Sequence, residues 1–228
     1  MARKILAIYP HPDDETFVGA GTLIQHTQAG DSVTLVCATL GQMGRRMGKP
    51  FFATRESLPH LREKELRDAC KVIGIADLRL WKMQDKMLQF KDEGYLAQKV
   101  LEVFDDVHPE VVYTFYPGHG VHPDHDALSA AVVRAVTLLP ETQRPVMRCK
   151  AVTINSRQVL GDPAMEVDVS NVIQEKISAL KAHKSQTEFI LTHLEEQIKA
   201  EPGNAARLLA PYAKETYWIY DTSGKTVS

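Results

Sequence analysis

The chain has 228 residues, of which 44% are hydrophobic and 25% charged, and its formal net charge at pH 7 is -2. This length and balance are typical of one globular domain, residues 1–228, and exclude a disordered chain. The charge shows no basic excess of the kind that binds nucleic acids, and no apolar run approaches the roughly 18 residues that span a bilayer. The apolar run before Pro10 is too short for a signal peptide, so we expect a cytoplasmic protein with no nucleic-acid or membrane partner.

Segments of strand and helix character alternate along the chain. Strands are expected at residues 4–9, 32–39, 78–81, 110–116, 149–155 and 215–220. Helices are expected at residues 16–29, 57–73, 94–107, 124–138, 171–183, 188–199 and 204–211. This alternation predicts an α/β fold with a mainly parallel sheet and right-handed crossovers. The aromatic last segment is interpreted as an edge strand, with an interface as the alternative. The three cysteines are widely spaced, which favours buried, reduced thiols over disulfides.

Two chain segments that follow predicted strands are rich in groups that bind metals. His11-Pro-Asp-Asp-Glu15 follows the first strand, and Gly118-His-Gly-Val-His-Pro-Asp-His125 follows the strand at 110–116. In open parallel sheets, functional sites form beyond the carboxyl ends of the strands, so both segments fall where a site is expected. Two histidines and one carboxylate, with a position left for water, are typical of a catalytic zinc site. His11, Asp14 and His125 are the candidate ligands.

The neighbouring residues complete a hydrolytic site. Zinc lowers the pKa of bound water to about 7, which gives a hydroxide-like nucleophile at neutral pH. Asp13, next to Asp14, is the candidate general base. His122 is the candidate donor to the oxyanion, best as an imidazolium, and Asp124 is the candidate for orienting one of the imidazoles.

Each segment also has a purely structural interpretation. Asp13, Asp14 and Glu15 could begin a helix, where carboxylates complement free N–H groups, and Asp124 could cap the helix that follows it. The presence of both segments at adjacent strand ends favours a catalytic metal site. His119, between two glycines, is interpreted as a loop residue.

These residues resemble the PIG-L/LmbE-like family of zinc-dependent N-acetylglucosamine deacetylases. The motifs P-H-P-D-D-E at Pro10 and H-P-D-H at His122 match the family's first two signatures, and K-x-x-A-L-x-x-H-x-S-Q from Lys176 to Gln186 matches a weaker third. The resemblance implies a Rossmann-like three-layer sandwich and hydrolysis of an acetamido group on glucosamine. It also implies the zinc ligands, general base and oxyanion histidine assigned above, although such sites accept Fe²⁺ and other divalent metals as well.

Substrate contacts are implied by the same resemblance. Arg62 matches a family arginine that holds sugar hydroxyls, and Asp85 resembles a family acid that contacts the sugar; a solvated helix face and a turn aspartate are the competing interpretations. Within the family, the sequence is most similar to bacillithiol-pathway deacetylases, which act on N-acetylglucosaminyl-malate. Arg45, Arg46 and Lys49, on the loop after the second strand, could meet the malate carboxylates, with a mobile solvated loop as the alternative.

Some alternatives stay open at this level. Some relatives have a tyrosine or arginine just before the second motif, whereas this chain has Gly120 and Val121, so a backbone N–H, His119 or Tyr116 could act instead. The alternative functions are deacetylation of another GlcNAc conjugate, hydrolysis of a thiol conjugate as an amidase, and sugar or metal binding without turnover. A dinucleotide enzyme is excluded, because no G-x-G-x-x-G follows the first strand. The resemblance makes a homo-trimer or hexamer the expected assembly. His183 could help to close the site, but no role is assigned to it.

Overall fold

The computed structural model describes residues 2–45, 47–48 and 50–223. Within them, seven strands form one sheet in the order β3-β2-β1-β4-β5-β7-β6. Strands β1 to β5 run parallel, and β7 runs antiparallel to both β5 and β6. The strands are β1 (Lys4–Tyr9), β2 (Ser32–Thr39), β3 (Asp77–Met83), β4 (Val111–Phe115), β5 (Val146–Lys150), β6 (Met165–Asp168) and β7 (Lys214–Ile219).

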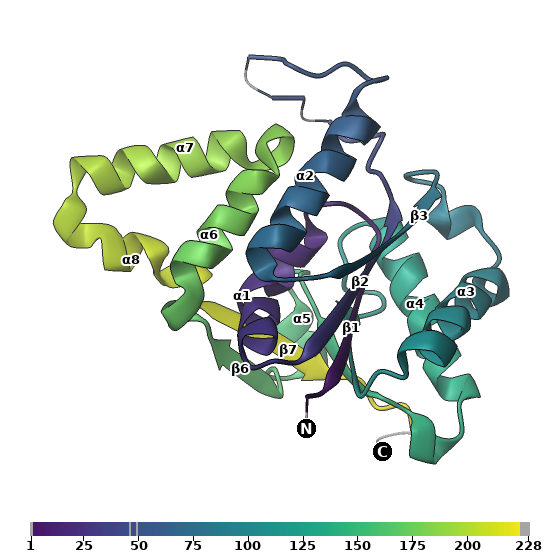
Figure 1. Ribbon diagram of the computed structural model, residues 1–228. Coiled ribbons are helices and arrows are strands. Elements are labelled where there is room, and N and C mark those ends of the chain that lie inside the picture. The colour runs from purple at the N-terminus through teal and green to yellow at the C-terminus, as the bar shows by residue number, and fades with distance from the viewer. Residues whose placement is uncertain (1, 46, 49, 224–228) are drawn as a thin grey trace.

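Helices cover both faces of the sheet, as Figure 1 shows, so the predicted α/β three-layer sandwich is confirmed. Helices α1, α2 and α6 pack together on one face and α3 and α4 on the other, while α7 and α8 extend from α6 at the left of the view. The helices are α1 (Asp14–Gln28), α2 (Leu58–Ile73), α3 (Glu93–Val107), α4 (Pro123–Leu138), α5 (Ser156–Leu160), α6 (Ile173–Ala182), α7 (Lys184–Ala200) and α8 (Ala205–Leu209).

The continuous apolar run of β1 follows from its central position. Successive side chains of a strand point to opposite faces, and both faces of β1 are covered. Ile5 and Tyr9 belong to the core beneath α1 and α2, whereas Leu6 and Ile8 belong to the core beneath α3 and α4. The strand is therefore held from both sides, and its carboxyl end is a fixed point from which the following loop begins.

The C-terminal part of the sheet differs from the prediction. The fifth strand covers 146–150 instead of 149–155, and the chain then turns into the short helix α5. The edge-strand interpretation of the aromatic segment is wrong, because β7 lies between β5 and β6. Strand β6 escaped prediction: it has only four residues, and its alternation of half-buried and exposed positions includes just two hydrophobic side chains.

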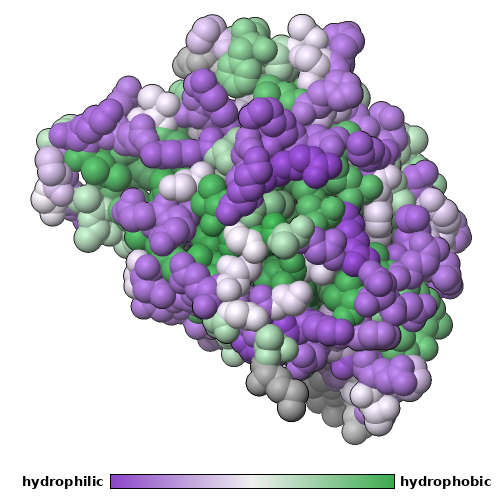
Figure 2. All heavy atoms as spheres, in the orientation of Figure 1, coloured by the Kyte–Doolittle hydropathy of each residue, from purple (hydrophilic) through white to green (hydrophobic). Residues whose placement is uncertain are grey.

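The surface and the thiols agree with the composition. Figure 2 shows a mainly hydrophilic face, with hydrophobic atoms gathered between α6, α7 and α8 and at the tip of the loop above α2. The three cysteines are buried and free, which confirms the expectation of reduced thiols. In the part of the chain that the structure describes, no helix is both long and apolar enough to cross a membrane.

The packing of α1 against Val169 gives a first testable prediction. A Cβ added to Gly21 would lie 2.5 Å from Cβ of Val169, which is fully buried. We expect Gly21→Ala to lower the free energy of unfolding, because overpacking costs about 1–3 kcal/mol and outweighs the roughly 1 kcal/mol that alanine gains over glycine in a helix. Gly203→Ala is the control in urea unfolding, since nothing lies within 4 Å of its Cβ position. Equal stability of both variants would contradict this account of the packing.

Candidate functional site

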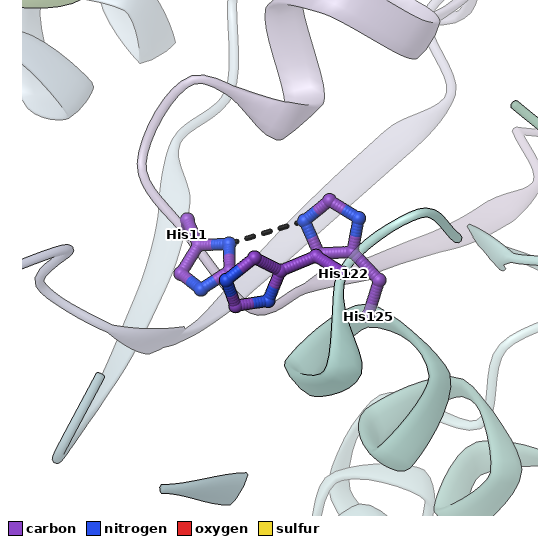
Figure 3. Close-up of side chains that lie close together, drawn as sticks. All are labelled: His11, His122 and His125. Carbon is purple, nitrogen blue, oxygen red and sulfur yellow. Dashed lines mark hydrogen bonds between the residues drawn. The ribbon is translucent and has the colours of Figure 1, made fainter. Parts of the chain in front are cut away.

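The first two motifs meet at the carboxyl edge of the sheet. Strands β1 and β4 are parallel neighbours, so the loops that follow them leave the same edge side by side. His11 comes from the β1–α1 loop, and His122 and His125 come from the start of α4, as Figure 3 shows. Nδ1 of His11 lies 3.1 Å from Nε2 of His125. The Asp14 carboxylate lies 3.4 Å from that nitrogen of His11 and 3.3 Å from that of His125.

Outer contacts fix the orientation of both imidazoles. His125 donates from Nδ1 to the Gly120 carbonyl at 2.7 Å, and its ring stacks on Phe115 with the centroids 4.0 Å apart. Nε2 of His11 faces Asp85 at 3.2 Å and Asp124 at 3.4 Å. Such partners hold the ring hydrogen on the outer nitrogen and leave the inner nitrogen as an acceptor.

His11, Asp14 and His125 are candidate ligands of a divalent metal ion, and among the described residues two other groups also lie within metal-binding reach: His11, His122 and His125, and His11, Asp85 and Asp124. Nδ1 of His11 and Nε2 of His125 lie 3.1 Å apart, and both face the Asp14 carboxylate; with the ring hydrogens on the outer nitrogens, both inner nitrogens would be available to a cation. Two nitrogens about 2.0–2.1 Å from a tetrahedral ion lie about 3.4 Å apart, close to the observed separation. Asp14 also accepts the His11 backbone N–H at 2.9 Å, which keeps its carboxylate beside both rings. The donor set suits zinc and other first-row metals alike.

A polar cavity of about 370 Å³ opens beside this cluster. Most of the residues singled out from the sequence line it: His11, Asp13, Asp14, Arg45, Arg62, Asp85, His122 and His125. Asp124 is fully buried behind His11. Arg46 and Lys49 lie outside the described residues. The sequence motifs therefore lead to one cavity, in which candidate metal ligands and candidate acid–base groups lie side by side.

Asp13 has a strained backbone and a partly buried carboxylate. Its φ of 111° lies in the left-handed region, which non-glycine residues seldom adopt and which is often found at functional sites. It is the residue before α1, but its side chain makes no capping hydrogen bond, so the helix-capping interpretation of this carboxylate is wrong. Burial raises the pKa of Asp13 to about 6, although the charge of Arg62 opposes the rise.

Arg62 holds Asp13 and the surrounding loops. Its guanidinium lies 3.1 Å from the Asp13 carboxylate and donates to the carbonyls of Gly41, at 3.0 Å, and Pro12. A Cβ on Gly41 would lie 2.0 Å from this guanidinium, so only glycine fits there. Arg62 is buried, which contradicts the interpretation as part of a solvated helix face. The partners of its guanidinium in the structure are protein groups.

Asp124 and Asp85 form a buried wall behind His11. Asp124 accepts the backbone N–H groups of Lys86, at 2.7 Å, and Leu88, at 3.0 Å, in addition to facing His11. Burial raises its pKa, but the hydrogen bonds outweigh burial and the pKa of Asp124 lies below its ordinary value. Asp85 accepts the Met43 N–H at 2.8 Å. The helix-cap interpretation of Asp124 is wrong, since the capping side chain of α4 is that of His122.

His122 is prepared to donate from Nε2. Its Nδ1 accepts the Asp124 N–H at 3.1 Å, so the hydrogen of a neutral ring resides on Nε2. Its ring lies edge-on to that of His11, with the centroids 4.8 Å apart. Burial and the neighbouring His11 and His125 lower the pKa of His122, which favours a neutral donor over the expected imidazolium.

The loop before His122 contains no tyrosine or arginine at the position where some relatives have one. His119 bonds through Nδ1 to the Thr153 hydroxyl at 2.7 Å, which supports its interpretation as a loop residue. Val121 is exposed and has a φ of 61°, an outlier for a β-branched residue. Neither side chain supplies a donor to the cavity, so His122 is the histidine of this loop that faces it.

A buried histidine–carboxylate pair lies beside the cavity. The sequence motifs assigned no role to its histidine. Nε2 of His183 lies 2.6 Å from the Glu15 carboxylate, and both side chains are inaccessible to solvent. Two residues further on, Ser185 donates its N–H and hydroxyl to Glu65, each at 2.7 Å. The third motif was the available signal, but its partners are more than a hundred residues away in the sequence and could not be read from it.

Fold and site together define an α/β protein with a metal-competent polar cavity at the switch between β1 and β4. Residues 6–136 match the model of the PIG-L family, described as GlcNAc-PI de-N-acetylase. A probable N-acetyl-alpha-D-glucosaminyl L-malate deacetylase 2 of Bacillus cereus is 46% identical over 220 residues, which are 96% of this chain and 99% of that protein. The chain therefore belongs to the PIG-L family of de-N-acetylases.

Solved structures share the fold. The N,N'-diacetylchitobiose deacetylase of Pyrococcus horikoshii superposes with a TM-score of 0.74 at 20% identity, over 97% of this chain and 85% of that one. GalB, a 4-carboxy-2-hydroxymuconate hydratase of Pseudomonas putida, superposes with a TM-score of 0.71 at 15% identity, over 99% of this chain and 100% of that one. One fold thus carries different reactions, so the argument for function has to come from the site.

Metal binding is the second testable prediction. We expect His125→Ala to weaken the binding of one Zn²⁺ by more than about 100-fold in equilibrium dialysis, because loss of a ligand exceeds the 10–100-fold effect of losing an outer partner. His60→Ala is the matched control, since His60 is exposed on α2. Unchanged affinity in His125→Ala would remove His125 from the ligand set.

Proposed function

We propose that this protein hydrolyses the acetamido group of N-acetylglucosaminyl-malate, with His11, Asp14 and His125 as the ligands of a divalent cation, zinc foremost. The observation that carries the proposal is the meeting of these three side chains within 3.1–3.4 Å at a cavity that Asp13 also lines. The name of the Bacillus cereus relative supports the malate conjugate as substrate. The family supports deacetylation as the reaction.

The side chains divide the proton transfers between them. A divalent cation at the three ligands would supply Lewis-acid chemistry, lowering the pKa of water and polarising the amide carbonyl. Asp13 takes a proton from the attacking water; because Arg62 faces Oδ2, the transfer falls to Oδ1. His122 donates a hydrogen bond from Nε2 to the oxygen on which negative charge develops. Asp13 then returns its proton to the leaving nitrogen, giving acetate and a free amine.

Asp85, Asp124 and Arg62 act by orienting other groups. Asp85 and Asp124 hold His11 through Nε2, and Arg62 holds the Asp13 carboxylate. The sugar contacts implied for Arg62 and Asp85 stay predictions, which their position at the cavity wall supports. A one-domain organisation over residues 1–228, a cytoplasmic location and a trimer or hexamer also stay predictions.

The test of this proposal is acetate release from N-acetylglucosaminyl-malate, with and without chelator. We expect Asp13→Asn to keep its fold and bound metal but to lose kcat by about 10²–10⁴-fold, the usual contribution of a general base. Asparagine is preferred to alanine because it tolerates the left-handed backbone of this position. Turnover near the wild-type rate in Asp13→Asn would exclude Asp13 as the base. Wild-type protein that releases no acetate from a panel of N-acetylglucosaminides would contradict the proposed function.

Specificity for malate is tested separately at Arg45, which lines the cavity. Arginine pairs strongly with carboxylates, so Arg45→Ala should lower kcat/KM for the malate conjugate by about tenfold or more and leave free N-acetylglucosamine nearly unchanged. Arg134→Ala, on α4 and paired with Glu93, is the control for loss of a surface charge. An equal loss for both substrates would show that Arg45 does not recognise the malate group.

A further inference from the structure

The Glu15–His183 pair connects the C-terminal third of the chain to the cavity. His183 lies between α6 and α7, beyond the last residue of the family-model match, and its Nε2 lies 2.6 Å from Oε1 of Glu15. Nδ1 of His183 is buried and has no hydrogen-bond partner among the described residues. Within the part of the chain that the structure describes, the one hydrogen-bond partner of this ring is therefore Glu15.

The second oxygen of Glu15 holds the backbone of Asp13. Oε2 of Glu15 accepts the Asp13 N–H at 3.0 Å, and Asp13 has the left-handed φ of 111°. A residue in this conformation keeps it only when its surroundings enforce it. Asp13 is thus held by Glu15 at its N–H and by Arg62 at its carboxylate, in addition to the hydrogen bonds that its carbonyl accepts from Thr16 and Phe17.

The Glu15–His183 pair is not needed merely to hold α1 against α6, because another buried cluster already joins these helices. Lys176, on α6, already meets Glu215 at 2.7 Å, and Glu215 accepts the N–H groups of Gly21 and Thr22 in the middle of α1. That cluster is equally buried but makes no contact with Asp13. The distinguishing property of the Glu15–His183 pair is its connection to the strained residue at the cavity.

We propose that His183 is a positioning residue: by holding Glu15, it fixes the backbone of Asp13 and directs the Asp13 carboxylate toward the cavity. This inference rests on the proposed role of Asp13 as general base. The segment between α6 and α7, which lies outside the first two motifs, is then required for turnover although it does not touch the substrate.

Two substitutions of similar polarity test whether the contact with Glu15 depends on a donor at the Nε2 position of His183. The side-chain amide nitrogen of glutamine can occupy the position of Nε2 of histidine, whereas that of asparagine corresponds to Nδ1. We expect His183→Asn to lower kcat by about 10–100-fold, the usual effect of removing a partner that orients an active-site group, with KM little changed. His183→Gln should recover most of the rate. Lys176→Met, which removes the other buried contact of α6, should lower the melting temperature but keep kcat.

Amide hydrogen exchange at Asp13 provides a readout that needs no substrate. Exchange should be at least about tenfold faster in His183→Asn than in the wild type, and near the wild-type rate in His183→Gln and Lys176→Met. This measurement still decides the proposal if no substrate is found, so failure of the proposed function is distinguishable from failure of the positioning role.

A double-mutant cycle completes the test. If His183 acts through Asp13, the His183→Asn substitution should cause no further loss of kcat in an Asp13→Asn background. Fully additive losses would overturn the proposal. So would wild-type exchange at Asp13 in His183→Asn, or the same pattern in Lys176→Met as in His183→Asn.

Discussion

The site depends on the balance of charge around the end of β1. The carboxylates of Asp14, Glu15, Asp85 and Asp124 are all buried there, and Asp13 lies beside them. A buried carboxylate is tolerated only when cationic groups or N–H donors compensate it, because removal from water is costly. Each of these acids has such a partner, and the partners come from distant parts of the chain. The arrangement of the surrounding loops is therefore set by electrostatic pairing as much as by the hydrophobic cores.

Asp14 differs from the other acids in what compensates it. Glu15 has His183, and Asp124 has two backbone N–H groups. Asp14 accepts the His11 backbone N–H and also faces the inner nitrogens of His11 and His125. With the ring hydrogens held on the outer nitrogens, both inner nitrogens can bind a cation beside the Asp14 carboxylate.

The sequence predicted the parts of this structure that are local. Alternation of strands and helices predicted the parallel core, and motifs placed directly after strands predicted that His11, Asp14 and His125 would meet. The rest depends on contacts that no local pattern encodes. The position of Arg62 depends on the left-handed Gly41, the Glu15–His183 pair joins residues 168 positions apart, and the edge strand β6 is formed mainly by pairing with β7.

The most direct test of the account is a crystal structure of the protein grown with Zn²⁺, with anomalous scattering measured at the zinc edge. The account predicts one strong site bound by Nδ1 of His11, the Asp14 carboxylate and Nε2 of His125, at about 2.0–2.2 Å from each, and beside the Asp13 carboxylate. Zinc bound elsewhere, or a His11 ring turned so that Nε2 is its ligand, would contradict it.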